Sequence, residues 1–456
     1  MASLLSRISY PPALRSLAGA ALLAPALAGC IASVDGEQAR ICRATLPALN
    51  SGATAIEVLR ETPGTLPRSL RIEYRIDEGA RARKRSVTCL FAAEGLARSR
   101  ADLVGLATED GPVSEASFYL LRRFYLETPD GVANTPAPPR DSSALPELPF
   151  PLAYGLQHFA AGAPRTAIYG LLAAGYALVF GLVRRFNLAY GEIAAIGAAA
   201  AGLGALIPAR LGFGAPAVGI AFAFAFAIFA AGLHGLIAGR MTLSPVPGSE
   251  RANLIATVGL AIALSEALRL VQGTTIPWLP PIFSEGTVVA RAGDFPVAVS
   301  PMSLATTGLG FLAASGLLLA MRRTAFGRAW RAYANDPLAA ALFGVDPRRL
   351  LATSLLIAGA LAGLAGALVV LQFGGLGFAG GFPLGLKALI AAILGGVASV
   401  GGAFAGGLAI GLFETFWSAY LPIDARDIAL YAMLALVIVL KPGGVFGPSA
   451  AAPRAV

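Results

Sequence analysis

The sequence is poor in charged side chains, in histidine and in cysteine. Only 13% of its 456 residues are Asp, Glu, Lys or Arg, whereas a soluble globular domain has about a quarter. It has two histidines and three cysteines, with no metal-spaced cysteine pair. The patterns H-E-x-x-H and G-x-S-x-G are also absent. We therefore expect a chain that is not a soluble enzyme, with no catalytic residue, no metal and no cofactor.

The phosphate-binding pattern G-x-x-x-x-G-K-[ST] is missing as well. Residues 381–387 contain two glycines and Lys387, but their spacing does not fit. That loop and its lysine are what hold ATP phosphates in nucleotide-binding proteins. Any ATP hydrolysis is therefore expected in a separate subunit. The net charge of +9 comes without a basic stripe interleaved with aromatics, so no nucleic acid is expected as a partner.

Apolar residues and glycine are abundant. The chain is 56% hydrophobic with 54 glycines, and its mean hydropathy is +0.70. Apolar runs of about 20 residues between short polar segments predict membrane-spanning helices. The predicted fold is an all-α polytopic membrane protein of about eight or nine segments with a small exported α+β domain at its N-terminus. The segments are residues 166–182, 193–207, 215–237, 254–271, 302–320, 351–371, 386–400, 403–416 and 428–440. The pair 386–400 and 403–416 is expected to hinge at Gly401 and Gly402.

Residues 1–30 have the pattern of a secretory signal. Two arginines precede the apolar stretch 17–28, which is too short to span a bilayer. The stretch ends in Leu-Ala-Gly-Cys30, which resembles the lipobox of bacterial lipoproteins, where Cys30 would be lipidated. An ordinary cleaved signal and an uncleaved anchor are the alternatives. Each of the three would export the residues that follow.

Residues 31–150 hold most of the acidic side chains and are expected to form the exported domain and a linker. Alternating apolar and polar residues predict strands at 70–76 and 86–91, with a basic turn at 77–85. Residues 114–126 fit either a helix or a strand. The proline- and serine-rich segment 130–151 is the expected linker.

Cys42 and Cys89 are the two cysteines of this domain. In an exported domain a disulfide between them is the natural pairing. It would close a loop of about 48 residues and stabilise the fold by about 4 kcal/mol in the chain-entropy model. The alternative is two free buried thiols.

Residues 325–349 form the longest polar, basic segment in the second half of the chain. Arg328, Arg331 and Asn335 share one face of an expected amphipathic helix at 325–334. Asp336 can cap a second short helix, and Gly344 suits its end. The excess of arginine and lysine on this side predicts that the segment is cytoplasmic. It either only fixes the orientation or docks a soluble partner.

This segment resembles the cytoplasmic coupling loop of permease subunits in ABC importers of the branched-chain amino acid type. The resemblance rests on Gly327, Arg328, Arg331, Asp336, Gly344 and Arg349. Two further stretches match, at residues 187–192 and 387–403, so that the resemblance covers about residues 168–447. Tyr190 is a departure, because relatives often carry His there.

The resemblance implies that residues 151–456 form a transmembrane permease domain in the bacterial inner membrane, in contact with membrane lipid. The implied partners are cytoplasmic ATP-binding subunits, a second permease subunit (identical or different) and an external solute-binding protein. The six residues of the loop would receive the movement of the ATPase. The expected solutes are branched-chain or related amino acids. Urea or short amides, an ATP-independent secondary transporter and an exported sensor domain with a membrane anchor remain alternatives.

Four polar residues lie in or beside the apolar runs: Asn187, Glu192, Lys387 and Glu414. Because charged groups are costly in lipid, they should face protein or water, and they are candidates for the translocation path. Interfacial snorkelling of Lys387 is the alternative. Two small-residue patterns, Gly359-x-x-x-Gly363 and Gly407-x-x-x-Gly411, allow close helix approach. They fit either packing within the chain or pairing of two subunits.

Overall fold

The computed structural model describes residues 34–50, 55–78, 81–93, 97–128, 131, 133–139, 145–211, 216–243, 250–273, 279, 283, 286–293, 295–441 and 443–446. The chain divides into two compact units, one made of Met1–Asp141 and Gly212–Gly219 and one made of Ser142–Leu211 and Ile220–Val456. The expected signal sequence and Cys30 lie outside the described residues.

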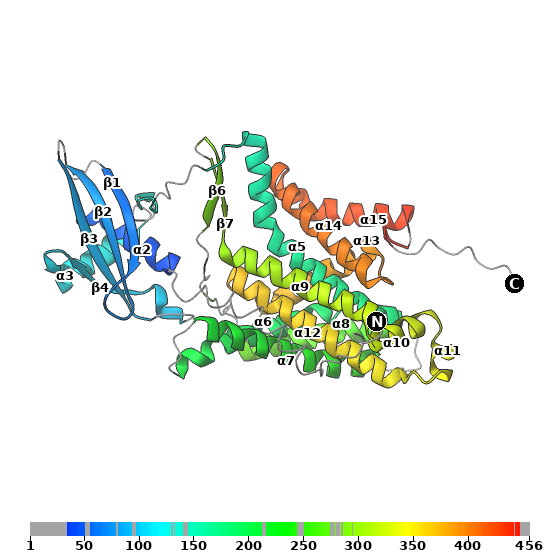
Figure 1. The fold of residues 1–456 in the computed structure, drawn as a ribbon. Helices are drawn as coiled ribbons and strands as arrows, with labels where there is room; N and C mark the ends of the chain where they lie inside the picture. Colours follow the sequence, from blue (N-terminus) through cyan, green and yellow to red (C-terminus); the bar gives the residue numbers. More distant parts are fainter. Residues whose placement is uncertain are drawn as a thin grey trace, which may run out of the picture. The chain divides into compact units, whose positions relative to one another are not determined.

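The first unit is an antiparallel five-stranded sheet with a helix packed on it (Figure 1). The strands follow chain order: β1 (Ala55–Pro63), β2 (Ser69–Glu78), β3 (Arg81–Phe91), β4 (Leu103–Thr108) and β5 (Gly111–Pro112). Helix α2 (Gly36–Leu49) begins at Asp35, whose carboxylate accepts the amide hydrogens of Glu37 and Gln38. Every second residue of β2 is buried, from Leu70 to Ile76, because side chains alternate between the faces of a sheet.

The expected strands are present, but the basic segment between them is not a turn. Residues 81–85 belong to β3, where Arg83 pairs with Ile76 and Arg85 pairs with Tyr74. Arg83 and Lys84 are both exposed, and pairing with β2 rather than an apolar alternation keeps them in the strand. Residues 114–126 are helical, with α3 (Glu115–Leu121) followed by a π-helical turn at Arg122–Leu126.

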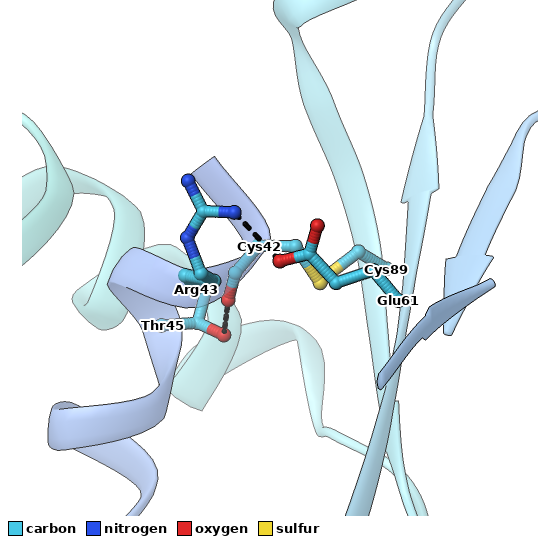
Figure 2. The surroundings of a disulfide bond; sticks show 5 residues. All are labelled: Cys42, Arg43, Thr45, Glu61 and Cys89. Carbon is cyan, nitrogen blue, oxygen red and sulfur yellow. Dashed lines mark hydrogen bonds and ion pairs between the residues drawn. A yellow bond between two sulfur atoms is a disulfide. The ribbon is translucent and has the colours of Figure 1, made fainter. Parts of the chain in front are cut away.

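A disulfide ties helix α2 to the sheet (Figure 2). Cys42 of α2 is bonded to Cys89 of β3, and both side chains are fully buried. Beside it, the guanidinium of Arg43 lies 2.6 Å from the carboxylate of Glu61 in β1, and the Thr45 hydroxyl donates to the Cys42 carbonyl at 2.8 Å. The helix is therefore attached to two strands by a covalent bond and a shielded ion pair.

The second unit is helical. Its helices are α5 (Phe150–Val183), α6 (Tyr190–Arg210), α7 (Pro216–Leu243), α8 (Glu250–Gln272), α9 (Pro301–Arg323), α10 (Ala325–Asn335), α11 (Pro337–Leu342), α12 (Pro347–Phe373), α13 (Gly381–Gly395), α14 (Val400–Tyr420) and α15 (Arg426–Leu440). Among the described residues, eight helices are long and apolar enough to cross a membrane. A hairpin of β6 (Thr287–Ala292) and β7 (Phe295–Val299) precedes α9. This architecture fits a polytopic membrane protein.

Helix α5 forms the centre of this unit. It packs against α14, α9, α12 and α13. In its most apolar stretch 89% of the residues are buried, against 22% in α7 and 17% in α8. An apolar helix that is exposed on most sides suits contact with lipid or with another membrane subunit. Helices α7 and α8 are therefore peripheral in this chain.

Both small-residue patterns are used for packing within the chain. A Cβ atom at Gly407 of α14 would lie 2.4 Å from the Cα of Gly170 in α5. A Cβ at Gly363 of α12 would lie 2.3 Å from the carbonyl oxygen of Ala227 in α7. Such distances are far below van der Waals contact, so the absence of a side chain allows these backbones to touch.

The expected hinge at Gly401 and Gly402 is placed differently. Helix α13 ends at Gly395, and Gly396 has a φ of +104°, a conformation that glycine adopts without strain. The hydroxyl of Ser399 then accepts the amide hydrogen of Gly402 at 3.1 Å and caps α14. The two glycines thus lie in the first turn of α14, because the serine cap starts the helix before them.

Candidate functional site

The segment 325–349 folds into a helical elbow, defined here as α10, α11 and the turn that leads into α12. The hydroxyl of Thr324 accepts the amide of Gly327 and caps α10. The Asp336 carboxylate accepts the amides of Leu338 and Ala339 at 3.0 and 2.9 Å and caps α11. Asp346 caps α12 in the same way. Three consecutive caps give this short polar segment a defined shape.

Helix α10 is anchored to the central helix α5. The indole N–H of Trp330 donates to the carbonyl of Leu178 at 2.9 Å, and the ring is buried. A Cβ atom at Gly181 would lie 2.3 Å from that ring, so this glycine makes room for it. Arg184, just past the end of α5, donates to the carbonyl of Ala334 at 2.8 Å. The elbow is thus joined rigidly to the core.

The residues singled out in the elbow have two kinds of position. A Cβ atom at Gly327 would lie 2.0 Å from the Met321 carbonyl oxygen, and Arg331 donates to that same carbonyl. Gly344 has a φ of +90°. These residues and Asp336 therefore set the shape of the elbow. Arg328 and Arg349 are exposed, and Arg349 lies 3.2 Å from Asp346 at the surface.

Three apolar side chains in and just after α11 were not predicted from the sequence. Leu338, Leu342 and Phe343 are 77%, 83% and 88% exposed. Two of them are spaced i, i+4, which places them on one face of the helix. That spacing inside a polar loop is the signal that could have revealed them. An exposed apolar patch on a protein surface marks an interaction site.

Lys387 and Glu414 are brought together. The ammonium of Lys387 in α13 lies 2.5 Å from the Glu414 carboxylate in α14 and 3.6 Å from that of Asp427 in α15. The hydroxyl of Tyr169 in α5 donates to the other oxygen of Glu414 at 3.0 Å. The Glu414 side chain is 1% exposed. Four helices therefore contribute to one ionic cluster, whose centre at Glu414 is buried and whose Asp427 end is 54% exposed.

Glu192 does not belong to this cluster. It lies in the first turn of α6, and its carboxylate is next to the N-terminus of α13. It is 2% exposed, and a Cβ atom at Gly381 would lie 2.4 Å from its Oε2. The Phe382 amide donates to its carboxylate. Helix N-termini favour negative charge. Lys387 is six residues further along α13 and therefore about 9 Å along the helix axis from Gly381. Glu192, which lies at Gly381, and the Lys387 cluster are thus two separate sites on α13.

Asn187 shapes the chain between α5 and α6. Its side-chain oxygen accepts a hydrogen bond from the backbone N–H of Ala189 at 3.1 Å. Its backbone N–H donates to the hydroxyl of Tyr176 at 2.8 Å. Tyr190, the departure from the family pattern, donates its hydroxyl to the Ala358 carbonyl at 3.0 Å. Both tyrosines therefore have partners inside the helix bundle.

Comparison with known proteins decides the family. The sequence profile described as "Branched-chain amino acid transport system / permease component" matches residues 159–440. This chain belongs to that permease family. The match starts inside α5 and ends with α15, so the membrane unit of this permease carries the family likeness.

Individual relatives agree with this assignment. The permease is 33% identical over 295 residues to the high-affinity branched-chain amino acid transport system permease protein LivH of Escherichia coli K12, covering 64% of this chain and 96% of LivH. It is 31% identical over 293 residues to BraD of Pseudomonas aeruginosa, covering 64% and 95%. It is 30% identical over 246 residues to the autoinducer 2 import system permease protein LsrC of Enterobacter sp. strain 638, covering 53% and 64%. No solved structure matches the chain.

Proposed function

We propose that this permease is the membrane subunit of an ATP-driven importer of branched-chain or related amino acids. The family match and the likeness to LivH and BraD support this proposal. The sequence has no phosphate-binding loop of the P-loop type, so the ATPase is a separate cytoplasmic subunit. A second permease subunit and an external solute-binding protein complete the assembly. Helix α8 suits the contact with the second subunit, because its apolar residues are mostly uncovered within this chain.

The observation that carries the coupling role is the exposed apolar face of α11. Leu338 and Leu342 lie on the short capped helix α11 of the elbow, and Phe343 follows its last residue. Apolar anchors surrounded by polar and charged side chains are the usual centre of a protein interface. The ATPase therefore contacts these three residues, and Arg328 and Arg349 lie at the rim of the contact.

The movement of the ATPase then reaches the core through α10. Trp330 is hydrogen-bonded to α5, and Arg184 is hydrogen-bonded to the end of α10. Helix α5 in turn packs against α9, α12, α13 and α14. A displacement of α11 is thus transmitted to the centre of the bundle rather than absorbed in a loose loop. Gly327 and Gly344 keep the elbow in the shape that this requires.

The solute passes beside α13. Two charged residues lie beside the first half of α13. Glu192 lies next to Gly381, and Glu414 forms an ion pair with Lys387. Buried charges in membrane proteins mark pathways and gates. The Lys387 cluster holds α13, α14 and α15 together in the conformation described here. Opening of the path separates these helices, and Asn187 holds the turn at the start of α6.

The sheet unit is exported and meets the solute-binding protein or reinforces the assembly. Its disulfide between Cys42 and Cys89 suits an oxidising compartment. The family match begins at residue 159, so this unit is an addition to the matched region. A lipidated Cys30 would attach it to the outer face of the membrane.

Purification of the tagged chain from its native host in mild detergent tests the proposal. We expect an ATPase to co-purify, and leucine uptake to require ATP, a solute-binding protein and no ion gradient. Urea uptake that leucine does not inhibit would move the assignment to the short amides. Uptake that persists after ATP depletion and collapses with the ion gradient would instead identify a secondary transporter.

A further inference from the structure

Three arginines line a pocket at the ends of three membrane helices. Arg185 follows α5, Arg240 lies in the last turn of α7, and Arg348 lies in the first turn of α12. Tyr333 of α10 also lines this pocket, whose volume is about 520 Å³. That volume is within the range of small-molecule sites. The elements come from three distant parts of the chain, so only the fold assembles this set.

The guanidinium groups have no acidic partner among the residues that the structure describes. In the described part of the chain, no carboxylate lies within ion-pair distance of Arg185, Arg240 or Arg348, and no acidic side chain is among the lining residues. The nearby carboxylate of Asp346 is used by backbone amides and by Arg349. Three clustered cations without a counterion repel one another and attract an anion.

The rest of the lining is apolar and leads into the membrane. Leu182 and Val183 of α5 and Leu351 and Ala352 of α12 lie about one turn farther into the spans than the arginines. Leu243 of α7 completes this side. Helix α7 leaves most of its apolar residues uncovered, so the pocket borders a surface suited to lipid. A ligand with an anionic head and an apolar body matches both parts.

We propose that this pocket binds the phosphodiester headgroup of an anionic membrane lipid. Arg forms charge-assisted hydrogen bonds with phosphate oxygens, often two at a time. Basic pockets between membrane helices on the cytoplasmic side are suited to such headgroups. Because Tyr333 belongs to the elbow and Arg348 to the first turn of α12 directly after it, a bound lipid joins the elbow to α5 and α7. Lipid charge would therefore stabilise the position of the elbow independently of any ATPase.

Lipid binding to the purified full-length chain tests this proposal. The detergent-solubilised and delipidated protein is titrated with phosphatidylglycerol, phosphatidylcholine and inorganic phosphate, and bound lipid is measured by native mass spectrometry. We expect phosphatidylglycerol to bind at least tenfold more tightly than phosphatidylcholine, without displacement by inorganic phosphate. Each of R185Q, R240Q and R348Q should weaken phosphatidylglycerol binding about fivefold. The triple variant should show no preference between the two lipids.

A matched control is K441Q, which removes an exposed cation that follows α15 and does not line the pocket. It should bind phosphatidylglycerol like the unaltered chain. Thermal unfolding in phosphatidylcholine checks folding, and the three single variants decide the matter if the triple variant does not fold. An unchanged lipid preference in these variants overturns the proposal. Displacement of phosphatidylglycerol by inorganic phosphate also overturns it and would identify a free anion as the ligand. Selective loss of ATPase binding with unchanged lipid binding overturns it too and would identify an acidic protein surface as the ligand.

Discussion

The ammonium of Lys387 lies 2.5 Å from the carboxylate of Glu414, within a bundle of apolar helices. The Glu414 side chain is almost completely buried, and Tyr169 donates a hydrogen bond to its second oxygen. One cluster therefore links α5, α13 and α14, and the weaker contact with Asp427 adds α15. Removal of either charge leaves the other in a poorly solvated place, where it is strongly unfavourable.

Substitution at this pair should therefore be non-additive. We expect K387M to destabilise the chain by about 3–5 kcal/mol, because it leaves the buried Glu414 carboxylate without a counter-charge. E414Q should cost less, because Lys387 keeps the carboxylate of Asp427 at 3.6 Å. The double variant should be more stable than the sum of the single effects predicts. Thermal unfolding of the four proteins in one detergent measures the coupling. Additive effects would show that the two side chains do not interact energetically.

Charge on α11 should block the contact with the ATPase. The variants L342E and F343E place a carboxylate on side chains that are more than four-fifths exposed, so the permease itself should fold normally. We expect loss of ATPase co-purification and of uptake, since a charge is costly at an interface core. L66E, at an exposed leucine of the sheet unit, is the control and should retain the ATPase. Retention by F343E would disprove the proposed contact.

Trp330 should be required for coupling as well as for stability. W330F keeps most of the packing and removes the hydrogen bond to Leu178, at a cost of about 1 kcal/mol. W330A also removes the buried ring, at a cost of about 3–5 kcal/mol. We expect W330F to bind the ATPase normally but to transport fewer solute molecules per ATP hydrolysed. Equal transport per ATP in W330F and the unaltered protein, measured in proteoliposomes, would restrict Trp330 to a packing role.

The glycines that let helices touch should not tolerate a methyl group. G363A directs a Cβ atom at the Ala227 carbonyl, and G407A directs one at the backbone of Gly170. Each should lower the thermal midpoint and the yield of folded protein. The control is G308A in α9, where no heavy atom lies within 4 Å of the added Cβ. That substitution should be neutral or stabilising, because alanine favours helices over glycine by about 1 kcal/mol.

The disulfide should stabilise the sheet unit. Replacing Cys42 and Cys89 by alanine removes a crosslink with a sequence separation of 47. In the chain-entropy model this costs about 4 kcal/mol. Limited proteolysis of the full chain, followed at sites in residues 34–128, should accelerate strongly in the double variant or after reduction. Unchanged proteolysis would mean that Arg43, Glu61 and the buried face of the sheet suffice to hold α2 in place.

The sequence by itself determined the class of the protein and its local structure. Long apolar runs are costly to expose to water, so they predicted most of the membrane helices without any knowledge of their packing. Asp336, Asp346 and Gly344 act on their own neighbours in the chain, and their caps and turn could be predicted for that reason. Alternation in residues 70–76 predicted a strand, but periodicity alone did not reveal that the basic residues 81–85 continue the next one.

Only the tertiary structure decided which distant residues meet. Lys387 pairs with Glu414 rather than with Glu192, although all three are polar residues near apolar runs. The small-residue patterns face helices of the same chain, because α12 packs on α7 and α14 on α5. Trp330 reaches Leu178, and Arg185, Arg240 and Arg348 share a pocket, across separations of about a hundred residues or more in most cases. Such contacts depend on how helices are arranged in space, whereas periodicity and capping report only on residues within a few turns of each other.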